Sequence, residues 1–160
     1  MVLMMRRAAL MLLALVGASC TLAPSPHQPP LADILELDCL EGVEPGAECT
    51  LQFLLRNRTG RDIELTGVSG SIGVSGSELG TFVFVGDDVI RPRRELVLEI
   101  GMTVLPGRAQ QTLSQLDDFR LGRMSYALTG EIQHQPGVAP TPFGTFGMLE
   151  TSPGKKGQFR

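Results

Sequence analysis

Hydrophobic and polar side chains alternate along several stretches of this chain, which is the pattern of β-strands with one buried face. The clearest stretch is residues 95–105, where Leu96, Leu98, Ile100, Met102 and Val104 share one face. The other predicted strands are residues 32–37, 50–56, 63–74, 81–85, 124–133 and 141–149. Turn sequences at residues 44–46, 58–60, 86–88, 91–93 and 135–137 separate them. About seven short strands predict an immunoglobulin/fibronectin-III-like antiparallel β-sandwich.

One stretch has a helical period instead. Between residues 109 and 119, Ala109, Leu113, Leu116 and Phe119 recur at helical spacing, with polar residues between them. The pattern predicts one short amphipathic α-helix. We expect it to cover one end of the sandwich, and the alternative is a helix that binds a partner.

The N-terminal segment has the pattern of an export signal. Arg6 and Arg7 precede an uncharged apolar run at residues 8–16, followed by small residues and Cys20. The run is shorter than the roughly 20 residues that span a bilayer. Residues 16–20 resemble a bacterial lipobox, in which the cysteine thiol receives a diacylglycerol and the freed amine is acylated. The alternative is an ordinary signal peptide with a coincidental cysteine.

These features divide the chain into four parts. Residues 1–19 are expected to be a signal peptide, and residues 20–31 the lipidated Cys20 with a proline-rich, extended spacer. Residues 32–150 are the predicted β-sandwich domain, and residues 151–160 a flexible tail. The expected location is the cell envelope, with a lipid anchor in a bacterial membrane. The periplasmic face of the outer membrane is favoured because Thr21, rather than Asp, follows Cys20.

Composition argues against several partners. Without residues 1–19 the chain has 12 basic and 17 acidic side chains, a formal charge of −5. Nucleic-acid binders instead cluster Lys and Arg, and this charge also argues against electrostatic docking on anionic lipid. The chain has no Trp and one Tyr, so it lacks the aromatic platforms that stack on bases.

Residues with catalytic or metal-binding chemistry are few. Of the two histidines, His27 lies in the spacer and His134 beside a Pro-Gly turn, whereas a zinc site needs three or four ligands. No serine lies in a Gly-x-Ser-x-Gly motif, and no glycine-rich phosphate loop is present. Asp87 and Asp88 fit an exposed hairpin tip, or alternatively a calcium or catalytic pair. We expect no catalytic residues, no metal, no cofactor and no small-molecule substrate.

Cys39 and Cys49 remain as an even pair once Cys20 is lipidated. In an exported chain the compartment is oxidising, which favours a disulfide between them. The alternative is two reduced, buried cysteines at strand ends.

Two segments resemble a known family. Asn57, at the start of residues 57–60, follows a strand as the Asn-Pro-Asn of the late embryogenesis abundant group-2 (LEA-2) family does, although Arg58 replaces the proline. We expect Asn57 to be a turn residue whose amide caps backbone groups where one strand leaves for the next. Residues 126–130, Tyr-Ala-Leu-Thr-Gly, match the later Tyr-x-Leu-x-Gly strand of this family, which carries the WHy (water stress and hypersensitive response) domain. The resemblance implies a small sandwich with one helix, no catalytic residues, and an association with desiccation or other stress.

Two functions are therefore expected. The first is a non-catalytic, membrane-tethered lipoprotein that serves in stress protection or envelope maintenance. The alternative is an immunoglobulin-like accessory lipoprotein that holds a protein partner in an envelope complex. The fold alone does not decide between them.

Overall fold

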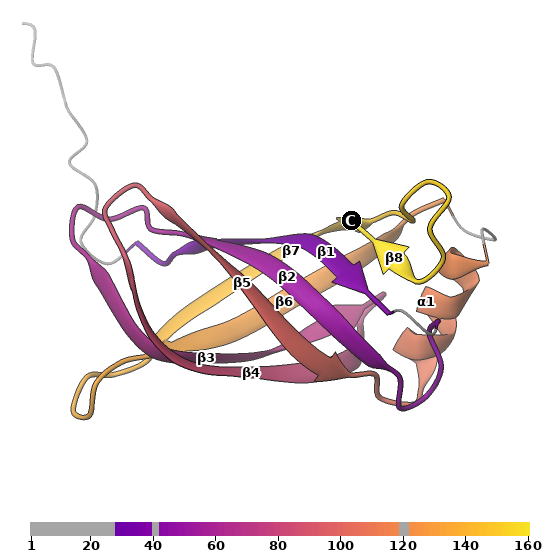
Figure 1. Cartoon of the computed structure of the whole chain (residues 1–160), viewed down its shortest axis with the longest axis horizontal. Coiled ribbons are helices and arrows are strands. Elements are labelled where there is room, and N and C mark those ends of the chain that lie inside the picture. Colours follow the sequence, from indigo (N-terminus) through magenta and orange to yellow (C-terminus); the bar gives the residue numbers. More distant parts are fainter. Residues whose placement is uncertain (1–27, 40–41, 119–121) are drawn as a thin grey trace, which may run out of the picture.

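Eight β-strands and one α-helix form the part of the chain described by the computed structural model, namely residues 28–39, 42–118 and 122–160. Figure 1 shows their arrangement. The prediction of a mostly β protein with one short helix is confirmed. The elements are β1 (Leu31–Asp38), β2 (Glu48–Arg56), β3 (Ile63–Val74), β4 (Ser77–Ile90), β5 (Glu95–Thr103), α1 (Arg108–Asp117), β6 (Met124–Gln133), β7 (Thr141–Leu149) and β8 (Gln158–Phe159).

The strands form one antiparallel sheet in the order β7-β6-β3-β4-β5-β2-β1-β8. Strands β4 and β5 are joined narrowly, by the paired residues Phe82 and Met102 and by the amide of Leu105, which donates to the carbonyl of Leu79 (2.7 Å). Irregular pairing places extra residues on β1 and β4, which bends these strands. The sheet curls until β1 contacts β7 (Figure 1). The predicted seven-stranded sandwich is therefore corrected to eight strands in one nearly closed, barrel-shaped sheet.

The core fills the inside of this curled sheet. Phe53 on β2 lies 5.4 Å from Phe82 on β4 and 6.0 Å from Phe143 on β7, measured between ring centroids. The paired glycines Gly70 and Gly130 make room for two of these rings. A Cβ on Gly70 would lie 2.6 Å from Phe82, and one on Gly130 would lie 2.5 Å from Phe143. Large rings on β4 and β7 thus require the smallest residue on β3 and β6.

Strand β4 is much longer than the predicted residues 81–85. It continues through Gly86, Asp87 and Asp88 to Ile90, so the turn predicted at residues 86–88 is wrong. Asp88 lies opposite Leu65 and Val85 lies opposite Gly67, so Gly86 and Asp87 fall in an irregularity of the β3–β4 pairing and the strand continues past them. Asp and Gly are rare in strands, and here they are tolerated on an exposed stretch of the sheet.

The C-terminal residues 151–160 belong to the folded domain, which corrects the predicted flexible tail. Phe159 on β8 is fully buried and pairs with Leu37 of β1. The backbone N–H and C=O of Arg160 are both bonded to Glu150, at 3.0 and 2.9 Å. A two-residue strand is too short to show an alternating pattern, and its neighbours Lys155, Lys156 and Gly157 are typical of a loop.

Helix α1 covers one end of the curled sheet. Its apolar face, formed by Ala109, Leu113 and Leu116, is fully buried, and the helix packs against β3 and β4. The described part of the helix therefore caps the core, as predicted, while Phe119 lies outside the described residues. Among the residues that the structure describes, we find no helix with the length and apolar character needed to cross a bilayer.

The two faces of β5 should respond differently to truncation. Leu98 is 4% exposed and pairs with Phe53, whereas Glu99 is exposed and accepts a hydrogen bond from Gln52 (2.9 Å). Leu98→Ala should lower the free energy of unfolding by about 2–5 kcal/mol because it leaves a cavity. Glu99→Ala should change it by no more than about 0.5 kcal/mol. Urea melts measure both, and equal effects would contradict the face assignment.

Candidate functional site

Three turns and the start of the described chain meet at one end of the molecule, which we call the turn end. It consists of residues 57–62 between β2 and β3, residues 91–94 between β4 and β5, the β6–β7 hairpin at residues 134–140, and residues 28–30. Figure 1 shows these segments at one end of the sheet and α1 with β8 at the other.

Asn57 fastens the turn end. Its side chain is fully buried, and its Nδ2 donates to the carbonyls of Arg61 (2.7 Å) and Ile90 (2.8 Å). Its Oδ1 accepts from the amide N–H and the hydroxyl of Thr59, both at 2.8 Å. The backbone N–H of Asn57 donates to the carbonyl of Arg94 (2.9 Å). The amide thus uses all four of its hydrogen-bonding positions.

These contacts join segments that are distant in the sequence. The Asn57 side chain bonds within its own turn and to the end of β4, and its backbone bonds to the turn before β5. A buried carbonyl without a partner costs free energy, so each bond removes a penalty as well as adding an attraction. Asn57 is therefore a capping residue of the turn end.

An open cleft of about 550 Å³ lies at the turn end, between residues 28–30, the β2–β3 turn and the β6–β7 hairpin. His134 and Thr141 line one wall, and Arg61 lies on another. The Nδ1 of His134 contacts the carbonyl oxygen of Glu64, and its Nε2 lies 2.8 Å from Oγ1 of Thr141. Because both ring nitrogens are engaged, His134 ties the base of the hairpin to β3 and presents no unoccupied nitrogen to a metal.

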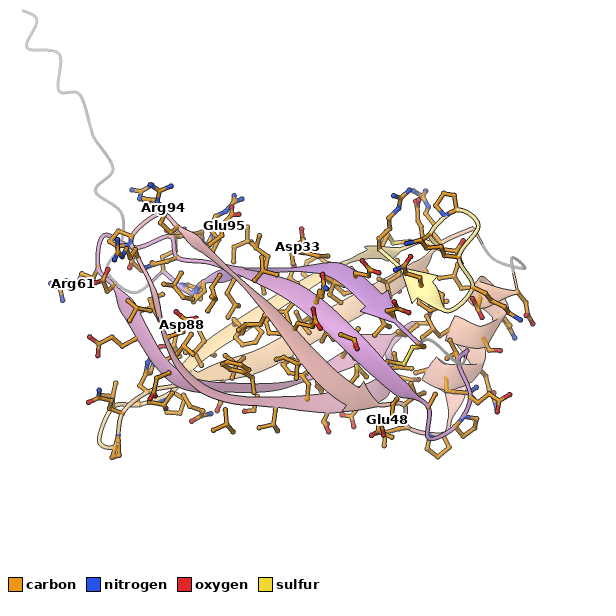
Figure 2. All side chains as sticks on the ribbon, viewed as in Figure 1. Asp33, Glu48, Arg61, Asp88, Arg94 and Glu95 are labelled. Atoms are coloured by element: carbon orange, nitrogen blue, oxygen red, sulfur yellow. A yellow bond between two sulfur atoms is a disulfide. The ribbon has the colours of Figure 1, made fainter. Side chains whose placement is uncertain are left out.

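Arginines gather on two turns of this end. Residues 56–62 and 91–94 contain Arg56, Arg58, Arg61, Arg91, Arg93 and Arg94, and one acidic residue, Asp62. Figure 2 labels both Arg61, which points outward from the end of the molecule, and Arg94, which lies at the upper side of the same end. The Nε and Nη2 of Arg58 donate to the carbonyl of Pro29, at 3.1 and 2.8 Å. The total charge does not reveal this arginine cluster, although both arginine-rich segments are visible in the sequence.

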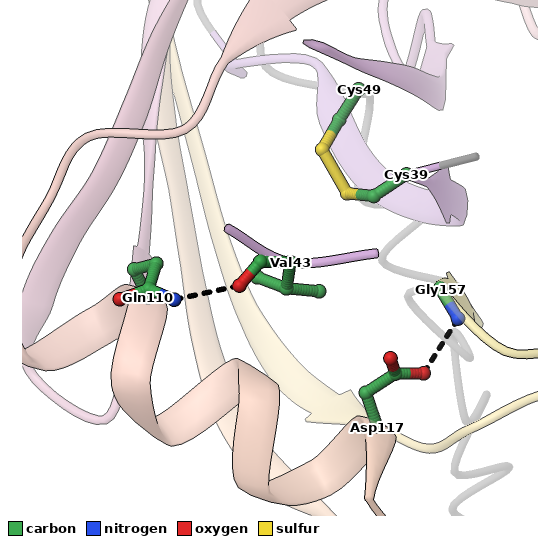
Figure 3. Close-up of a disulfide and its surroundings, with 6 residues drawn as sticks. All are labelled: Cys39, Val43, Cys49, Gln110, Asp117 and Gly157. Carbon is green, nitrogen blue, oxygen red and sulfur yellow. Dashed lines mark hydrogen bonds between the residues drawn. A yellow bond between two sulfur atoms is a disulfide. The ribbon is translucent and has the colours of Figure 1, made fainter. Parts of the chain in front are cut away.

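The opposite end is closed by a disulfide and by the C-terminal segment (Figure 3). A disulfide joins Cys39, just after β1, to Cys49 on β2, with their Cα atoms 4.3 Å apart. A loop this short is worth about 2–3 kcal/mol in the chain-entropy estimate. Both cysteines are buried within the hydrophobic core, which is continuous with the helix-capped end.

Two hydrogen bonds hold the surrounding segments to α1. The Nε2 of Gln110 donates to the carbonyl of Val43 (2.6 Å), and the N–H of Gly157 donates to Oδ1 of Asp117 (2.5 Å). The carbonyl of Gly157 accepts from Cys39 (2.8 Å). Gly157 has φ +77°, and a Cβ there would lie 2.2 Å from the Cys39 carbonyl oxygen. Position 157 therefore requires glycine.

Tyr126 bridges the seam where the curled sheet approaches itself. It comes from β6, and its hydroxyl donates to Oδ1 of Asp33 on β1 (2.9 Å) and accepts from the N–H of Ile34 (3.5 Å). A Cβ on Gly147 of β7 would lie 2.7 Å from the Tyr126 ring, so glycine lets the ring reach β1. Burial, reinforced by the hydrogen bond to Asp33, raises the pKa of Tyr126 to about 12.

The remaining candidate residues do not gather into a site. Cys20 and His27 lie outside the described residues. Asp87 and Asp88 are exposed on β4, and Asp88 accepts a hydrogen bond from the N–H of Val89 (2.7 Å). Within residues 28–39, 42–118 and 122–160, no group of three or more His, Cys, Asp or Glu side chains is placed to hold a metal ion.

The geometry defines a small, mostly β domain with one capping helix. Its fold is similar to that of a protein from Arabidopsis thaliana solved in solution, at 17% identity, with 90% of this chain and 93% of that one covered and a TM-score of 0.51. The likeness supports the fold alone.

Two further solved structures are more distant. A crystal structure of a protein from Archaeoglobus fulgidus has 12% identity and a TM-score of 0.42, covering 78% of this chain and 98% of that one. A candidate late embryogenesis abundant (LEA) protein solved in solution has 17% identity and a TM-score of 0.39, covering 74% and 69%. No family model and no curated protein matches the chain.

Removing the amide of Asn57 should destabilise the whole domain. Asn57→Ala leaves the buried carbonyl of Ile90 without its donor and the buried N–H of Thr59 without its acceptor, at about 1–3 kcal/mol for each orphaned group, while the carbonyl of Arg61 still accepts from the Thr59 hydroxyl (3.0 Å). We expect a loss of about 3–5 kcal/mol in the free energy of unfolding. Gln111→Ala, which truncates an exposed amide on α1, is the matched control. Similar denaturant midpoints for the two variants would contradict the capping role.

Alkaline titration should show the environment of Tyr126 directly, because it is the only tyrosine in the chain. Phenolate absorbance should appear in the folded protein with a pKa of about 12, and in urea near the ordinary value of about 10. Since the folded-state pKa is raised, the related stabilisation is present below pH 10 and is lost as the pH rises from about 10 towards 12. Tyr126→Phe should abolish the absorbance change. Ionisation near pH 10 in the folded protein would contradict burial of the hydroxyl.

Proposed function

We propose that this chain is a non-catalytic bacterial lipoprotein, anchored through Cys20, whose LEA-2/WHy-like domain serves in desiccation or stress protection or in envelope maintenance. Neither a cofactor nor a small-molecule substrate is part of this proposal. The location proposed is the cell envelope, on the periplasmic face of the outer membrane.

The observation that carries the LEA-2-like part is the role of Asn57. The two segments that resemble the family are also two of the places where the fold is fastened. Asn57 caps the turns at one end, and Tyr126 bridges the seam between β6 and β1. A match at residues that hold the fold together supports a shared architecture more strongly than a match of exposed residues.

The lipoprotein part is supported by the sequence and by the position of Pro29. The signal-like segment with Cys20 precedes a proline-rich stretch, and Arg58 holds the carbonyl of Pro29 at the turn end. A chain that leaves from the extreme end of a domain can be tethered without covering any face of the sheet.

Replacing the acylated cysteine tests the anchor. Cys20→Ser removes the thiol that would receive the lipid, so the variant should lose palmitate labelling and remain uncleaved or become soluble. The same strain, compared with one that carries the wild-type gene, should survive drying as poorly as a deletion strain. A Cys39→Ser/Cys49→Ser variant controls for loss of other thiols and should still be labelled. Unchanged labelling of Cys20→Ser would overturn the anchor.

A protein partner in an envelope complex is the second candidate function. It is favoured by the large apolar side chains that the sheet exposes: Phe146 on β7 is 88% exposed, and Val83 and Val85 on β4 are 66% and 84% exposed. Affinity purification of the lipidated protein from envelopes separates the two candidates. A stoichiometric partner that is lost with Phe146→Ser favours the complex, and a desiccation phenotype without such a partner favours the protective role.

A further inference from the structure

The arginines of the turn end are held by a rigid base. Arg61 and Arg94 each contribute a backbone carbonyl that accepts a hydrogen bond from Asn57, and the next residue before Arg91 is Ile90, whose carbonyl accepts another. The two turns therefore keep a fixed spacing.

Most of these arginines have no acidic partner. Arg56 is paired with Glu95, while Arg58 is occupied by the Pro29 carbonyl. Within the described residues, no carboxylate forms an ion pair with Arg61, Arg91, Arg93 or Arg94, and all four are exposed. Asp62, Asp87 and Asp88 lie beside the turns. The exposed Glu64 lines the same cleft as Arg61. An arginine side chain reaches several ångströms farther than an aspartate and farther than a glutamate, so the guanidinium groups can extend beyond these carboxylates.

An uncharged apolar tip lies at the same end. Residues 136–140 of the β6–β7 hairpin are Pro-Gly-Val-Ala-Pro, all exposed, and Val138 is 60% exposed. Val138 and Arg61 line the same cleft, and Figure 1 shows the hairpin projecting from the turn end. Cationic side chains beside an apolar tip suit a lipid–water interface, where the charges meet phosphates and the tip enters the headgroup layer.

The start of the described chain is also here. Gln28 and Pro30 line the same cleft as Arg61. Eight residue steps separate Cys20 from Gln28, and a chain spans at most about 3.3–3.6 Å per residue. An anchor at Cys20 would hold the turn end within about 30 Å of the bilayer surface, whereas α1 and β8 lie at the far end of the molecule (Figure 1).

We propose that the turn end is a docking surface for anionic phospholipid headgroups, which Arg61, Arg91, Arg93 and Arg94 bind through phosphate while Val138 enters the headgroup layer. Arginine suits this role because its planar fork donates two parallel hydrogen bonds to phosphate. The proposal rests on the anchor at Cys20 to bring this end to the membrane. It also revises the expectation from net charge, because the formal charge of −5 is an average over a surface whose two ends differ.

Vesicle binding by a chain that begins at Thr21 tests the docking without the lipid. This chain keeps every described residue. It should sediment with vesicles that contain phosphatidylglycerol and not with pure phosphatidylcholine vesicles, and added salt should weaken the binding. The Arg61→Gln/Arg91→Gln/Arg94→Gln variant should lose about tenfold to a hundredfold in partition coefficient, given the effect of each basic residue near an anionic surface.

A matched variant controls for total charge. Arg108→Gln/Arg123→Gln/Arg160→Gln removes three exposed arginines outside the turn end and should lose no more than about threefold. Equal losses for the two triple variants, or equal binding to both kinds of vesicle, would overturn the proposal.

A fluorescent reporter tests the apolar tip, because the chain contains no tryptophan. The emission of Val138→Trp should shift to shorter wavelength and be quenched by brominated lipid when phosphatidylglycerol vesicles are added. Val83→Trp, on the exposed face in the middle of β4, should show neither change. Quenching at residue 83 and not at residue 138 would mean that a different face meets the lipid.

The two levels of the proposal can fail separately. Palmitate labelling lost in Cys20→Ser, together with no vesicle binding by the untethered chain, would overturn the docking and leave the anchor. Selective vesicle binding together with unchanged labelling in Cys20→Ser would overturn the anchor and leave a surface that binds anionic lipid.

Discussion

The side-chain amide of Asn57 is the contact on which the turn end depends. Backbone carbonyls that are buried where strands end need hydrogen-bond donors from the protein. One amide gives both of its donors to two such carbonyls and both of its acceptor positions to Thr59. Only Asn and Gln carry a planar amide with two donors and an acceptor oxygen, and Asn is the shorter of the two. The spacing of the arginine-bearing turns follows from this single buried group.

At the other end of the molecule, different contacts cover the ends of the strands. The ends of β1 and β2 are covered by the Cys39–Cys49 disulfide, by helix α1 and by the hydrogen-bonded segment at Gly157. Along the side, Tyr126 fills the gap between β6 and β1, where no strand pairing is present among the described residues. Open sheet edges invite pairing with other chains, so covering this seam protects the domain as well as holding it together.

Local pattern was enough to predict most strands. The face of β5 and the turn role of Asn57 could be read from alternation and from the residue types at a strand end. The structure bears out the Leu98 face and the capping contacts. The length of β4 could not be predicted, because Gly86, Asp87 and Asp88 have turn propensity and the strand continues only because its pairing with β3 resumes at Asp88. The contact between Tyr126 and Asp33 joins residues 93 apart, which no local pattern encodes.

The net charge of the protein does not describe how its charged side chains are distributed over the surface. The total is negative, and a partner that feels the whole molecule from a distance would sense an acidic protein. Within a Debye length of about 8 Å, however, only nearby groups act. At the turn end those groups include the arginines of two turns that Asn57 holds together, with Asp62 beside them. A lipid tether at this end would keep the domain near the membrane without electrostatic attraction from a distance. The interaction with the membrane would then depend on the nearby arginines rather than on the total charge. The lipid anchor and the arginine cluster are therefore complementary. The anchor would hold the domain near the membrane, and the arginines would bind the headgroups at short range.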